Sequence, residues 1–299
     1  MHPLAGVYAA AVTSLKEDGL PDLEAFPPLL NFLARRGAHG ALILGTTGEG
    51  PSFSPEERAG IFRAALQVRA AHPDFRLLAG TGTPSLTETA ALTRTAFDLG
   101  FDGVVVLPPY YFRNVGQEGL FDYFSELIRR ALPADGPLFI YHIPSLTGVA
   151  LPLSLLERLK QAFPRQFAGL KDSSHDADFA RLLGESFGEQ LAVFTGTDSL
   201  FLPALETHAC GCITAPANLI SPDLRRVWDA FGAGEDAAPA QARLSAIRHV
   251  LEKFPPFPPL LKALLARQHG FPRWPVRPPL RPISEDDLER AGKGMEEAN

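Results

Sequence analysis

Eight short apolar runs recur along the chain, and their spacing most restricts what it can fold into. Each run is followed by a loop rich in Gly, Thr, Pro or Asp and then by a longer amphipathic stretch. Successive runs start 34, 35, 28, 35, 29, 24 and 20 residues apart, and the starts are Gly6, Gly40, Phe75, Gly103, Leu138, Phe167, Leu191 and Gly211. Continuous apolar runs of this length are typical of parallel strands covered on both faces. Eight such units predict a closed (β/α)₈ TIM barrel rather than an open sheet.

The stretches between the runs carry helix signals. Ser54 precedes Pro55 and two glutamates, an order typical of an N-cap followed by the first helical turn. A second stretch, from Leu92 to Leu99, ends at Gly100, a residue favoured just after a helix.

After the eighth run the chain continues with residues 222–299, which predict further helices near 237–254 and 260–269. Proline-rich segments at 254–259 and 272–282 forbid one continuous helix there. We therefore expect a barrel core over residues 1–221, with the last barrel helix and a C-terminal helical extension over 222–299 in the same structural unit.

Length and charge restrict the class of protein. A chain of 299 residues suits a barrel built as one unit. A formal net charge of −6, with scattered basic residues, gives no footprint for nucleic acid. No apolar run reaches the ~18 residues of a membrane span, and the first residues do not resemble a signal peptide. Cys210 and Cys212 are too few for a disulfide framework. These features predict a cytoplasmic protein without nucleic-acid or membrane partners.

Lys171, which lies at the end of the sixth run, is the strongest candidate for a catalytic residue. In such barrels the functional side chains gather at the C-terminal ends of the strands. A lysine that ends an apolar run lies where water is scarce, and this favours the neutral, nucleophilic amine. The alternative is a lysine at the barrel rim paired with a carboxylate such as Asp172. These residues alone leave both interpretations open.

Two further strand ends carry polar groups. The loop after the second run, Gly45-Thr46-Thr47-Gly48, offers hydroxyls and backbone N–H groups suited to a carboxylate. It lacks the Gly-Lys-Ser/Thr of a phosphate-binding P-loop, and the alternative is an ordinary turn. Tyr141 ends the fifth run, and strand alternation does not decide whether it faces into the barrel.

A metal site is the competing means of stabilising an enolate. The eight histidines show neither H-x-H nor H-E-x-x-H spacing. His142 and His175 follow the fifth and sixth runs and are the two that could converge at the barrel mouth. We expect no metal and no other cofactor.

Four motifs occur in one order at one set of spacings. They are Gly45-Thr46-Thr47-Gly48-Glu49, Pro109-Tyr110-Tyr111, Tyr141 with Ile143-Pro144 and Thr147-Gly148, and Gly169-Leu170-Lys171-Asp172. Together they resemble the dihydrodipicolinate synthase / N-acetylneuraminate lyase family of class I, Schiff-base aldolases. The resemblance runs from about residue 6 to residue 218, with a family-like helical tail behind it.

The resemblance implies a role for several residues of these motifs. Lys171 would form an imine with pyruvate or a related 2-oxo acid, and Tyr141 would transfer protons beside it. Thr47 would hydrogen-bond to the phenol, and Tyr111 would complete the relay from a neighbouring subunit. The family is usually tetrameric, so a homo-oligomer (a tetramer or dimer of dimers) is implied.

The resemblance also implies a pocket for the keto acid. The backbone of Thr46, Thr47 and Gly48 and the two threonine hydroxyls would bind the substrate carboxylate, and Ile213 would line the pocket at the end of the eighth run. The partner implied is therefore a small-molecule 2-oxo acid, held covalently by the lysine without a metal.

Two departures bear on the substrate. Synthases of the lysine precursor usually carry an Arg where this chain has Leu146, and a leucine cannot make the bidentate contact of a guanidinium. Leu146 is similar to the neuraminate lyases and the 2-keto-3-deoxy sugar acid aldolases. The segment Gly196-Thr197-Asp198-Ser199 has Ser199 where neuraminate lyases carry a Glu. Asp198, Thr197 and Ser199 are therefore the candidate partners for substrate hydroxyls.

These residues favour reversible cleavage of a 2-keto-3-deoxy sugar acid to pyruvate and an aldehyde. One alternative is 4-hydroxy-tetrahydrodipicolinate (dihydrodipicolinate) synthase, which condenses pyruvate with aspartate semialdehyde. Another is a catalytically silent family member that binds a keto acid. A phosphorylated substrate is disfavoured, because no basic residue accompanies Gly196 or Gly211 in the loops where barrels bind phosphate.

Overall fold

Eight parallel strands close into a barrel in chain order, as the spacing of the apolar runs predicts. The computed structural model describes residues 2–298. Each strand pairs with the next, and β1 pairs with β8 to close the ring. The strands are β1 (Gly6–Ala10), β2 (Gly40–Ile43), β3 (Arg76–Gly80), β4 (Gly103–Val106), β5 (Leu138–His142), β6 (Phe167–Asp172), β7 (Ala192–Thr195) and β8 (Gly211–Thr214).

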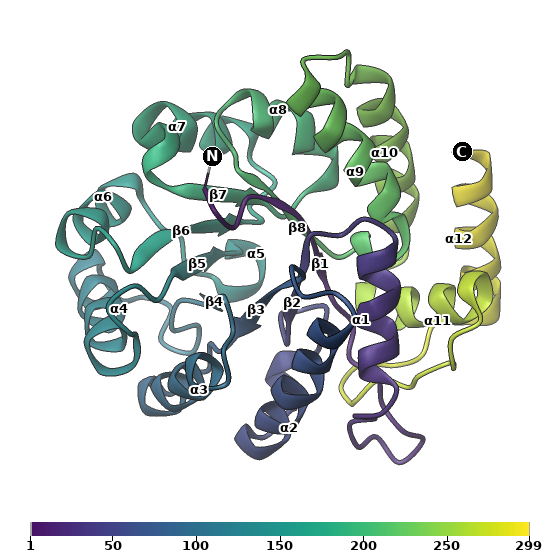
Figure 1. Ribbon diagram of the computed structural model, residues 1–299, viewed down its shortest axis with the longest axis horizontal. Helices are drawn as coiled ribbons and strands as arrows, with labels where there is room; N and C mark the ends of the chain where they lie inside the picture. The colour runs from purple at the N-terminus through teal and green to yellow at the C-terminus, as the bar shows by residue number, and fades with distance from the viewer. Residues whose placement is uncertain (1, 299) are drawn as a thin grey trace.

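Helices surround the barrel, and the last ones gather on one side of it (Figure 1). The barrel-side helices are α1 (Phe26–Arg35), α2 (Pro55–Leu66), α3 (Leu86–Asp98), α4 (Gln117–Ala131), α5 (Pro144–Thr147), α6 (Leu153–Ala162), α7 (Ala177–Phe187), α8 (Phe201–Glu206) and α9 (Ala217–Ala233). The C-terminal helices are α10 (Ala238–Leu251), α11 (Phe257–His269) and α12 (Glu285–Glu297). Short 3₁₀ segments are η1 (Gly50–Ser52), η2 (Gln67–Ala70), η3 (Gly188–Gln190) and η4 (Asp198–Leu200).

The helix signals in the sequence correspond to real caps. Ser54 accepts a hydrogen bond from the N–H of Glu57, and the Glu57 side chain accepts one from the N–H of Ser54, which completes a capping box at the start of α2. The helix predicted over residues 92–99 is α3, which ends at Asp98 with Leu99 as its C-cap and Gly100 next, at a φ of 94°. It begins earlier than predicted, at Leu86 behind the N-cap Ser85.

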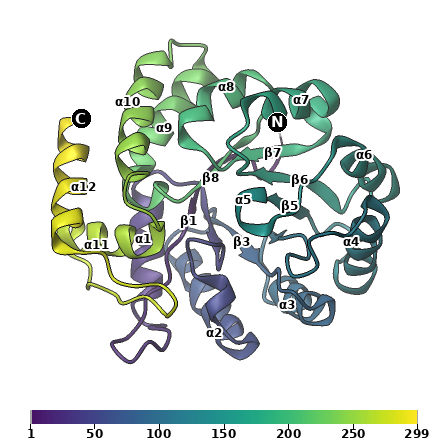
Figure 2. The same cartoon turned by 180° about the vertical axis from the view of Figure 1, so that it is seen from behind.

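The C-terminal extension packs on the barrel beside α1. In both views α11 lies next to α1 (Figures 1 and 2). Phe32 of α1 contacts His269 and Phe271 with ring centroids 4.9 and 5.1 Å apart. The helices predicted near 237–254 and 260–269 are α10 and α11. The division drawn between residues 221 and 222 falls at a kink in α9, where Ile220 has non-helical torsions and Pro222 interrupts the helix.

Two apolar regions result from strand alternation. Side chains on one face of the strands pack under the helices in a large outer core. Those on the other face fill the barrel, and this interior cluster contains Leu4, Tyr8, Ala10, Leu42, Leu78, Val105, Phe139, Tyr141, Ala168, Ala192, Phe194 and Ile213. The barrel is therefore a packed core whose open end lies at the C-terminal ends of the strands.

No helix among residues 2–298 is long and apolar enough to cross a membrane.

Asn218 secures the seam at which the barrel closes. Its fully buried side chain accepts a hydrogen bond from the N–H of Val12 (3.1 Å) and donates to the carbonyl oxygens of Ala10 and Ala215 (2.8 Å each). The side chain thus supplies hydrogen-bond partners to backbone groups at the ends of β1 and β8, where strand pairing stops. Buried backbone groups must be paired or they destabilise the fold.

We expect Asn218→Ala to lower the free energy of unfolding by about 2–4 kcal/mol, because it leaves buried donors and acceptors unpaired. Urea unfolding followed by circular dichroism measures this. The matched control is Asn31→Ala in α1, whose side-chain oxygen is buried without a hydrogen-bond partner within residues 2–298. The control should change stability by less than about 1 kcal/mol. Equal losses in both variants would contradict the assigned role of Asn218.

Candidate active site

Lys171 and Tyr141 lie side by side near the open end of the barrel. They are paired residues in the parallel register of β5 and β6. The Lys171 Nζ is 4.0 Å from the centroid of the Tyr141 ring, and both side chains are buried, with Lys171 only 3% exposed. Because Tyr141 belongs to the interior cluster, the structure answers the question that alternation left open. The phenol faces into the barrel, beside the amine.

The carboxylate next to Lys171 in sequence has another partner. Asp172 Oδ1 is 2.9 Å from His142 Nδ1, and both side chains are buried. Its oxygens also accept hydrogen bonds from the N–H and the hydroxyl of Ser174. The His142 ring packs on Phe179 of α7. Asp172 and His142 therefore occupy the helix-facing side of their strands, and the alternative of a Lys171–Asp172 rim pair is excluded.

The electrostatic surroundings of Tyr141 favour its ionised form. Burial raises the pKa of the phenol, but the adjacent Lys171 ammonium and the hydroxyls of Thr46 and Ser173 outweigh burial and hold the pKa below its usual range. A phenol of this kind gives up and regains a proton more readily than an ordinary tyrosine.

The hydroxyl that meets the phenol is that of Thr46, which corrects one expectation. We expected Thr47 to hydrogen-bond to Tyr141, and the structure places Thr46 there instead. The reason is the tight turn formed by residues 46–49, in which the Glu49 N–H bonds to the Thr46 carbonyl at 3.1 Å. In a turn of this kind, neighbouring side chains point in different directions.

The same turn presents free backbone donors. Within residues 2–298, no protein acceptor pairs with the N–H groups of Thr46, Thr47 or Gly48. The Gly48 carbonyl accepts a hydrogen bond from the Thr13 hydroxyl at 2.7 Å, which fixes the turn from below. A row of successive N–H groups forms a small cradle for an anion.

A small cavity lies between this turn and Tyr141. Its lining includes Thr46, Tyr141, Leu42 and Val105, together with Pro51 of η1. Ile213 is fully buried in the same interior cluster as Tyr141, opposite this wall of the barrel. The predicted carboxylate-binding turn and the predicted pocket residue therefore belong to the same end of the barrel interior.

The backbone around the turn adopts conformations that few residues tolerate. Leu44 and Glu49 have φ values of 59° and 56°, in the left-handed region. Gly48 and Gly50 are close to the Leu44 backbone, and a Cβ on Gly50 would lie 2.1 Å from the Leu44 carbonyl oxygen. Strained residues of this kind persist only where their surroundings enforce them.

Ser173 is a site residue that the sequence did not single out for the site. It is buried, and its hydroxyl contributes to the lowered pKa of Tyr141. A Cβ at residue 196 would lie 1.9 Å from the Ser173 Oγ, so Gly196 leaves the room for this hydroxyl. Ser173 lies two residues after Lys171, and residues two apart in an extended chain point to the same side. This spacing could have indicated Ser173 from the sequence.

The structure shows Asp198, expected to bind substrate hydroxyls, in an ion pair within the protein, while its Oδ1 is buried without a hydrogen-bond partner among residues 2–298. Its side chain is fully buried, and Oδ2 is 2.7 Å from Arg248 Nη1 of α10. Its backbone carbonyl accepts a hydrogen bond from Gln241, also of α10. Asp198 therefore links the loop after β7 to the C-terminal extension. Ser199, half-buried beside it, remains at the barrel mouth.

Tyr111 and Leu146 lie apart from this buried group. Tyr111 is 75% exposed and stacks edge-to-face on the exposed Phe112, with centroids 5.3 Å apart. Leu146 is 58% exposed in α5. Tyr111 and Phe112 form an exposed aromatic pair in the loop after β4, and Leu146 is exposed after β5. Solvated aromatic residues of this kind are favoured at protein interfaces.

Within residues 2–298, no group of three or more His, Cys, Asp or Glu side chains is placed to hold a metal ion. His142 is engaged with Asp172, and His175 is exposed, so the two histidines do not converge.

The arrangement combines three chemical capacities in one buried space. Lys171 is an amine shielded from water, Tyr141 is a phenol with a lowered pKa, and the Thr46–Gly48 turn offers anion-binding N–H groups. An amine beside a proton-transfer group and an anion site can form an imine with a carbonyl compound that carries a carboxylate.

Comparisons with known proteins agree with this chemistry. A model of the "Dihydrodipicolinate synthetase family" matches residues 3–298. An uncharacterized DapA-like lyase of Chloroflexus aurantiacus is 42% identical over 285 residues, which cover 95% of this chain and 93% of that protein. The 4-hydroxy-tetrahydrodipicolinate synthase of Synechococcus sp. (strain CC9605) is 33% identical, covering 97% and 93%. The crystal structure of DHDPS from Cyanidioschyzon merolae with lysine bound superposes with a TM-score of 0.91 at 27% identity, covering 100% and 99%.

We expect spectrophotometric titration of the phenols to show a tyrosine that ionises below the ordinary value near pH ~10. This phase should vanish in Tyr141→Phe and persist in the control Tyr123→Phe, because burial raises the pKa of Tyr123. Lys171→Met should move the phase to higher pH, since it removes the ammonium that favours the phenolate. A phase that survives in Tyr141→Phe, or that ignores Lys171→Met, would contradict the electrostatic assignment.

Proposed function

The chain belongs to the dihydrodipicolinate synthetase family and is a carbon–carbon lyase of the Schiff-base type, and we propose that it cleaves a hydroxylated 2-oxo acid to pyruvate and an aldehyde. The observation that carries the proposal is the buried Lys171 amine, 4.0 Å from the Tyr141 ring and close to a cradle of N–H groups. We propose a 2-keto-3-deoxy sugar acid as the substrate class.

In the proposed reaction the Lys171 amine attacks the C2 carbonyl of the 2-oxo acid, and water leaves to give an iminium. Tyr141, as phenolate, takes the proton of the C4 hydroxyl. The C3–C4 bond then breaks, an aldehyde departs, and the bonding electrons move into the iminium to form an enamine. Protonation at C3 and addition of water at C2 release pyruvate and restore the amine. Atoms and electrons balance without a metal or a redox cofactor, and we propose that none is used.

The substrate carboxylate is proposed to bind the N–H groups of Thr46, Thr47 and Gly48. An anion there stays within reach of the Lys171 ammonium before the imine forms, and N–H donors bind a carboxylate without competing for the amine. Thr46 is proposed to serve as the hydroxyl of the proton relay, since it already meets the phenol. Ile213 would line the keto-acid pocket.

Tyr111 is proposed to complete the relay of a neighbouring subunit. Its ring is largely solvent-exposed in the single chain and stacks on the exposed Phe112. An exposed aromatic pair of this kind suits contact with a second copy of the chain. We therefore propose a homo-oligomer in which each site is completed by its partner.

Leu146 supports the proposed substrate class. It lies at the mouth of the barrel, and it gives no charge to a second carboxylate. Aspartate semialdehyde carries such a carboxylate, whereas the aldehyde fragment of a deoxy sugar acid carries hydroxyls. Ser199 and Thr197 remain as proposed hydroxyl partners. The Thr197 hydroxyl is buried without a hydrogen-bond partner within residues 2–298.

The second candidate is 4-hydroxy-tetrahydrodipicolinate synthase, and the relatives that carry this name favour it. The two functions separate in a comparison of kcat/KM for 2-keto-3-deoxy sugar acids and for aspartate semialdehyde with pyruvate. The variant Leu146→Arg sharpens the comparison, because it adds the missing cation at the barrel mouth. The proposed aldolase should gain synthase activity in this variant. High synthase activity in the wild type, without the arginine, would favour the second candidate.

We expect pyruvate with sodium borohydride to add one reduced pyruvate adduct at Lys171, because reduction traps the imine as a secondary amine. Intact-mass spectrometry followed by peptide mapping measures it. Lys171→Met should form no adduct, and Tyr141→Phe should form it more slowly. The buried lysine Lys262, 1% exposed, is the internal control and should stay unmodified. A wild-type protein without an adduct at Lys171 would exclude the Schiff-base mechanism.

We expect inactive Tyr111→Phe and inactive Lys171→Met chains to recover activity when they are refolded together. A mixed dimer contains one site with both residues intact, so random pairing restores about a quarter of wild-type activity. Exchange of the pyruvate methyl protons in deuterated water, followed by NMR, measures this without knowledge of the aldehyde. Tyr141→Phe mixed with Lys171→Met is the control, since both residues belong to one chain. No recovery in the first mixture would contradict the shared site.

A further inference from the structure

A fully buried ion pair joins the carboxylate-binding turn to the C-terminal extension. The Glu49 Oε1 is 2.5 Å from the Lys262 Nζ of α11, and the two side chains are 0% and 1% exposed. The Lys262 ammonium also donates to the Pro275 carbonyl at 2.7 Å. Glu49 closes the turn that begins at Thr46, so the ammonium of α11 holds the last residue of that turn.

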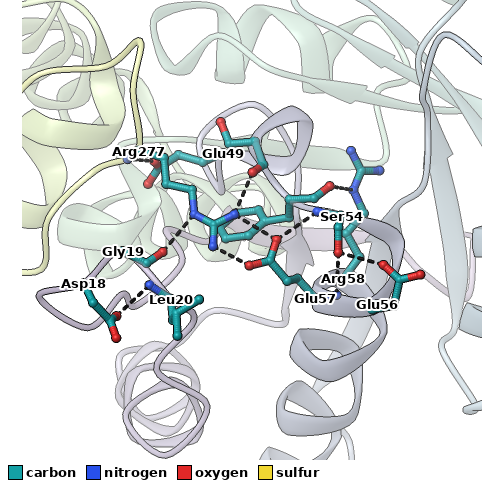
Figure 3. A network of polar contacts seen from close by, with 11 residues as sticks. Asp18, Gly19, Leu20, Glu49, Ser54, Glu56, Glu57, Arg58 and Arg277 are labelled. Atoms are coloured by element: carbon teal, nitrogen blue, oxygen red, sulfur yellow. Dashed lines mark hydrogen bonds and ion pairs between the residues drawn. The ribbon is translucent and has the colours of Figure 1, made fainter.

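The proline-rich segment after α11 adds a second connection. The N–H of Arg277 donates to Glu49 Oε2 at 3.0 Å, so both oxygens of Glu49 are bound by the extension. The Arg277 guanidinium donates to the Ser52 carbonyl at 2.7 Å and pairs with Glu57, and it lies 4.5 Å from the Phe53 ring centroid. Figure 3 shows this guanidinium between Glu57 and the Gly19 carbonyl, which accepts a hydrogen bond at 2.8 Å.

These contacts reach the segment that directly follows the anion cradle, residues 49–53. Glu49 ends the turn whose N–H groups are unpaired, and Ser52 and Phe53 follow Pro51, which lines the cavity beside Tyr141. The turn is strained, because Leu44 and Glu49 both have left-handed torsions. A strained turn keeps its shape only if other groups hold it. Within residues 2–298 both donors that bind the Glu49 carboxylate, the Lys262 ammonium and the backbone N–H of Arg277, come from the extension.

A gain in stability does not by itself explain a buried ion pair such as Glu49–Lys262. Removing two charges from water is costly, and packed apolar residues of similar volume often stabilise a fold as well or better. A buried pair instead specifies one geometry, because only one arrangement satisfies both charges. Here the geometry specified is that of the turn.

We propose that Lys262 and Arg277 of the C-terminal extension are positioning residues for the 2-oxo acid site, acting through Glu49 and the 50–53 segment on the Thr46–Gly48 cradle. The inference rests on the proposed function. In this proposal the C-terminal extension contributes to the binding site, although the extension lies on the outside of the barrel. Lys171 belongs to β6 and receives nothing from these contacts, so binding of the carboxylate and reactivity of the amine should separate.

The test follows reductive trapping by cyanoborohydride as a function of pyruvate concentration. The main variant is the double substitution Glu49→Gln with Lys262→Met, which removes both charges together and leaves an amide oxygen for the Arg277 N–H. We expect the half-saturating pyruvate concentration to rise about tenfold, the effect of misplacing one or two hydrogen bonds to an anion. The maximal trapping rate should stay within about twofold of wild type.

Arg277→Met is the second variant, because the Arg277 side chain is less buried than the Glu49–Lys262 pair. It should raise the half-saturating concentration about threefold, because the backbone bond to Glu49 remains while the 50–53 segment is released. If the double variant does not fold, Arg277→Met alone tests whether the extension affects pyruvate binding. The matched control is Arg69→Met, which breaks the 2.6 Å pair with Asp102 before β4, at the other end of the barrel. It should lower Tm and leave half-saturation unchanged.

Unchanged half-saturation in a folded Glu49 and Lys262 double variant or in Arg277→Met would overturn the proposal. A parallel loss of maximal rate and affinity, matched by Arg69→Met at equal loss of Tm, would also overturn it, because that is the signature of general destabilisation. In both cases wild-type trapping at Lys171 would still stand. Absence of trapping in the wild type would remove the proposed function and this inference together.

Discussion

The parallel register of β5 and β6 is the constraint on which the site depends. It pairs Tyr141 with Lys171 and turns both side chains into the barrel, 4.0 Å from ring centroid to amine. The next pair in the same register, His142 and Asp172, consequently faces the helices and forms its own hydrogen bond. One alternation therefore separates the reactive amine from the neighbouring carboxylate. A slip of β6 by one residue would turn Lys171 toward the helices and away from Tyr141.

Around this pair the fold supplies a positive, water-poor space. The ammonium of Lys171 and the N–H groups of the 46–48 turn attract an anion, and the hydroxyls of Thr46 and Ser173 support a phenolate at Tyr141. The turn is held by contacts from residues more than two hundred positions later in the chain. In the proposed mechanism the chemistry therefore depends on the whole chain, since the barrel places the proposed nucleophile and the extension holds the proposed anion site.

Much of this could be predicted from the sequence, because the decisive information was local. Apolar runs at regular spacing predicted the barrel, which is confirmed. A lysine at the end of a run indicated a candidate nucleophile, and its chemical role stays a prediction. Direction within a tight turn was not predictable, so Thr47 was expected where Thr46 lies. Long-range pairing was not predictable either. Asp198 was expected to face the substrate, but Arg248, fifty residues later, neutralises it. The pairing of Glu49 with Lys262 spans 213 residues, and no local pattern indicated it.

The measurement that tests the central claim most directly is a crystal structure of the protein soaked with pyruvate. We expect continuous density from Lys171 Nζ to C2 of pyruvate, with the carboxylate on the N–H groups of the Thr46–Gly48 turn and the Tyr141 hydroxyl beside the imine. Pyruvate bound without a bond to Lys171, or with its carboxylate on another part of the barrel mouth, would contradict it.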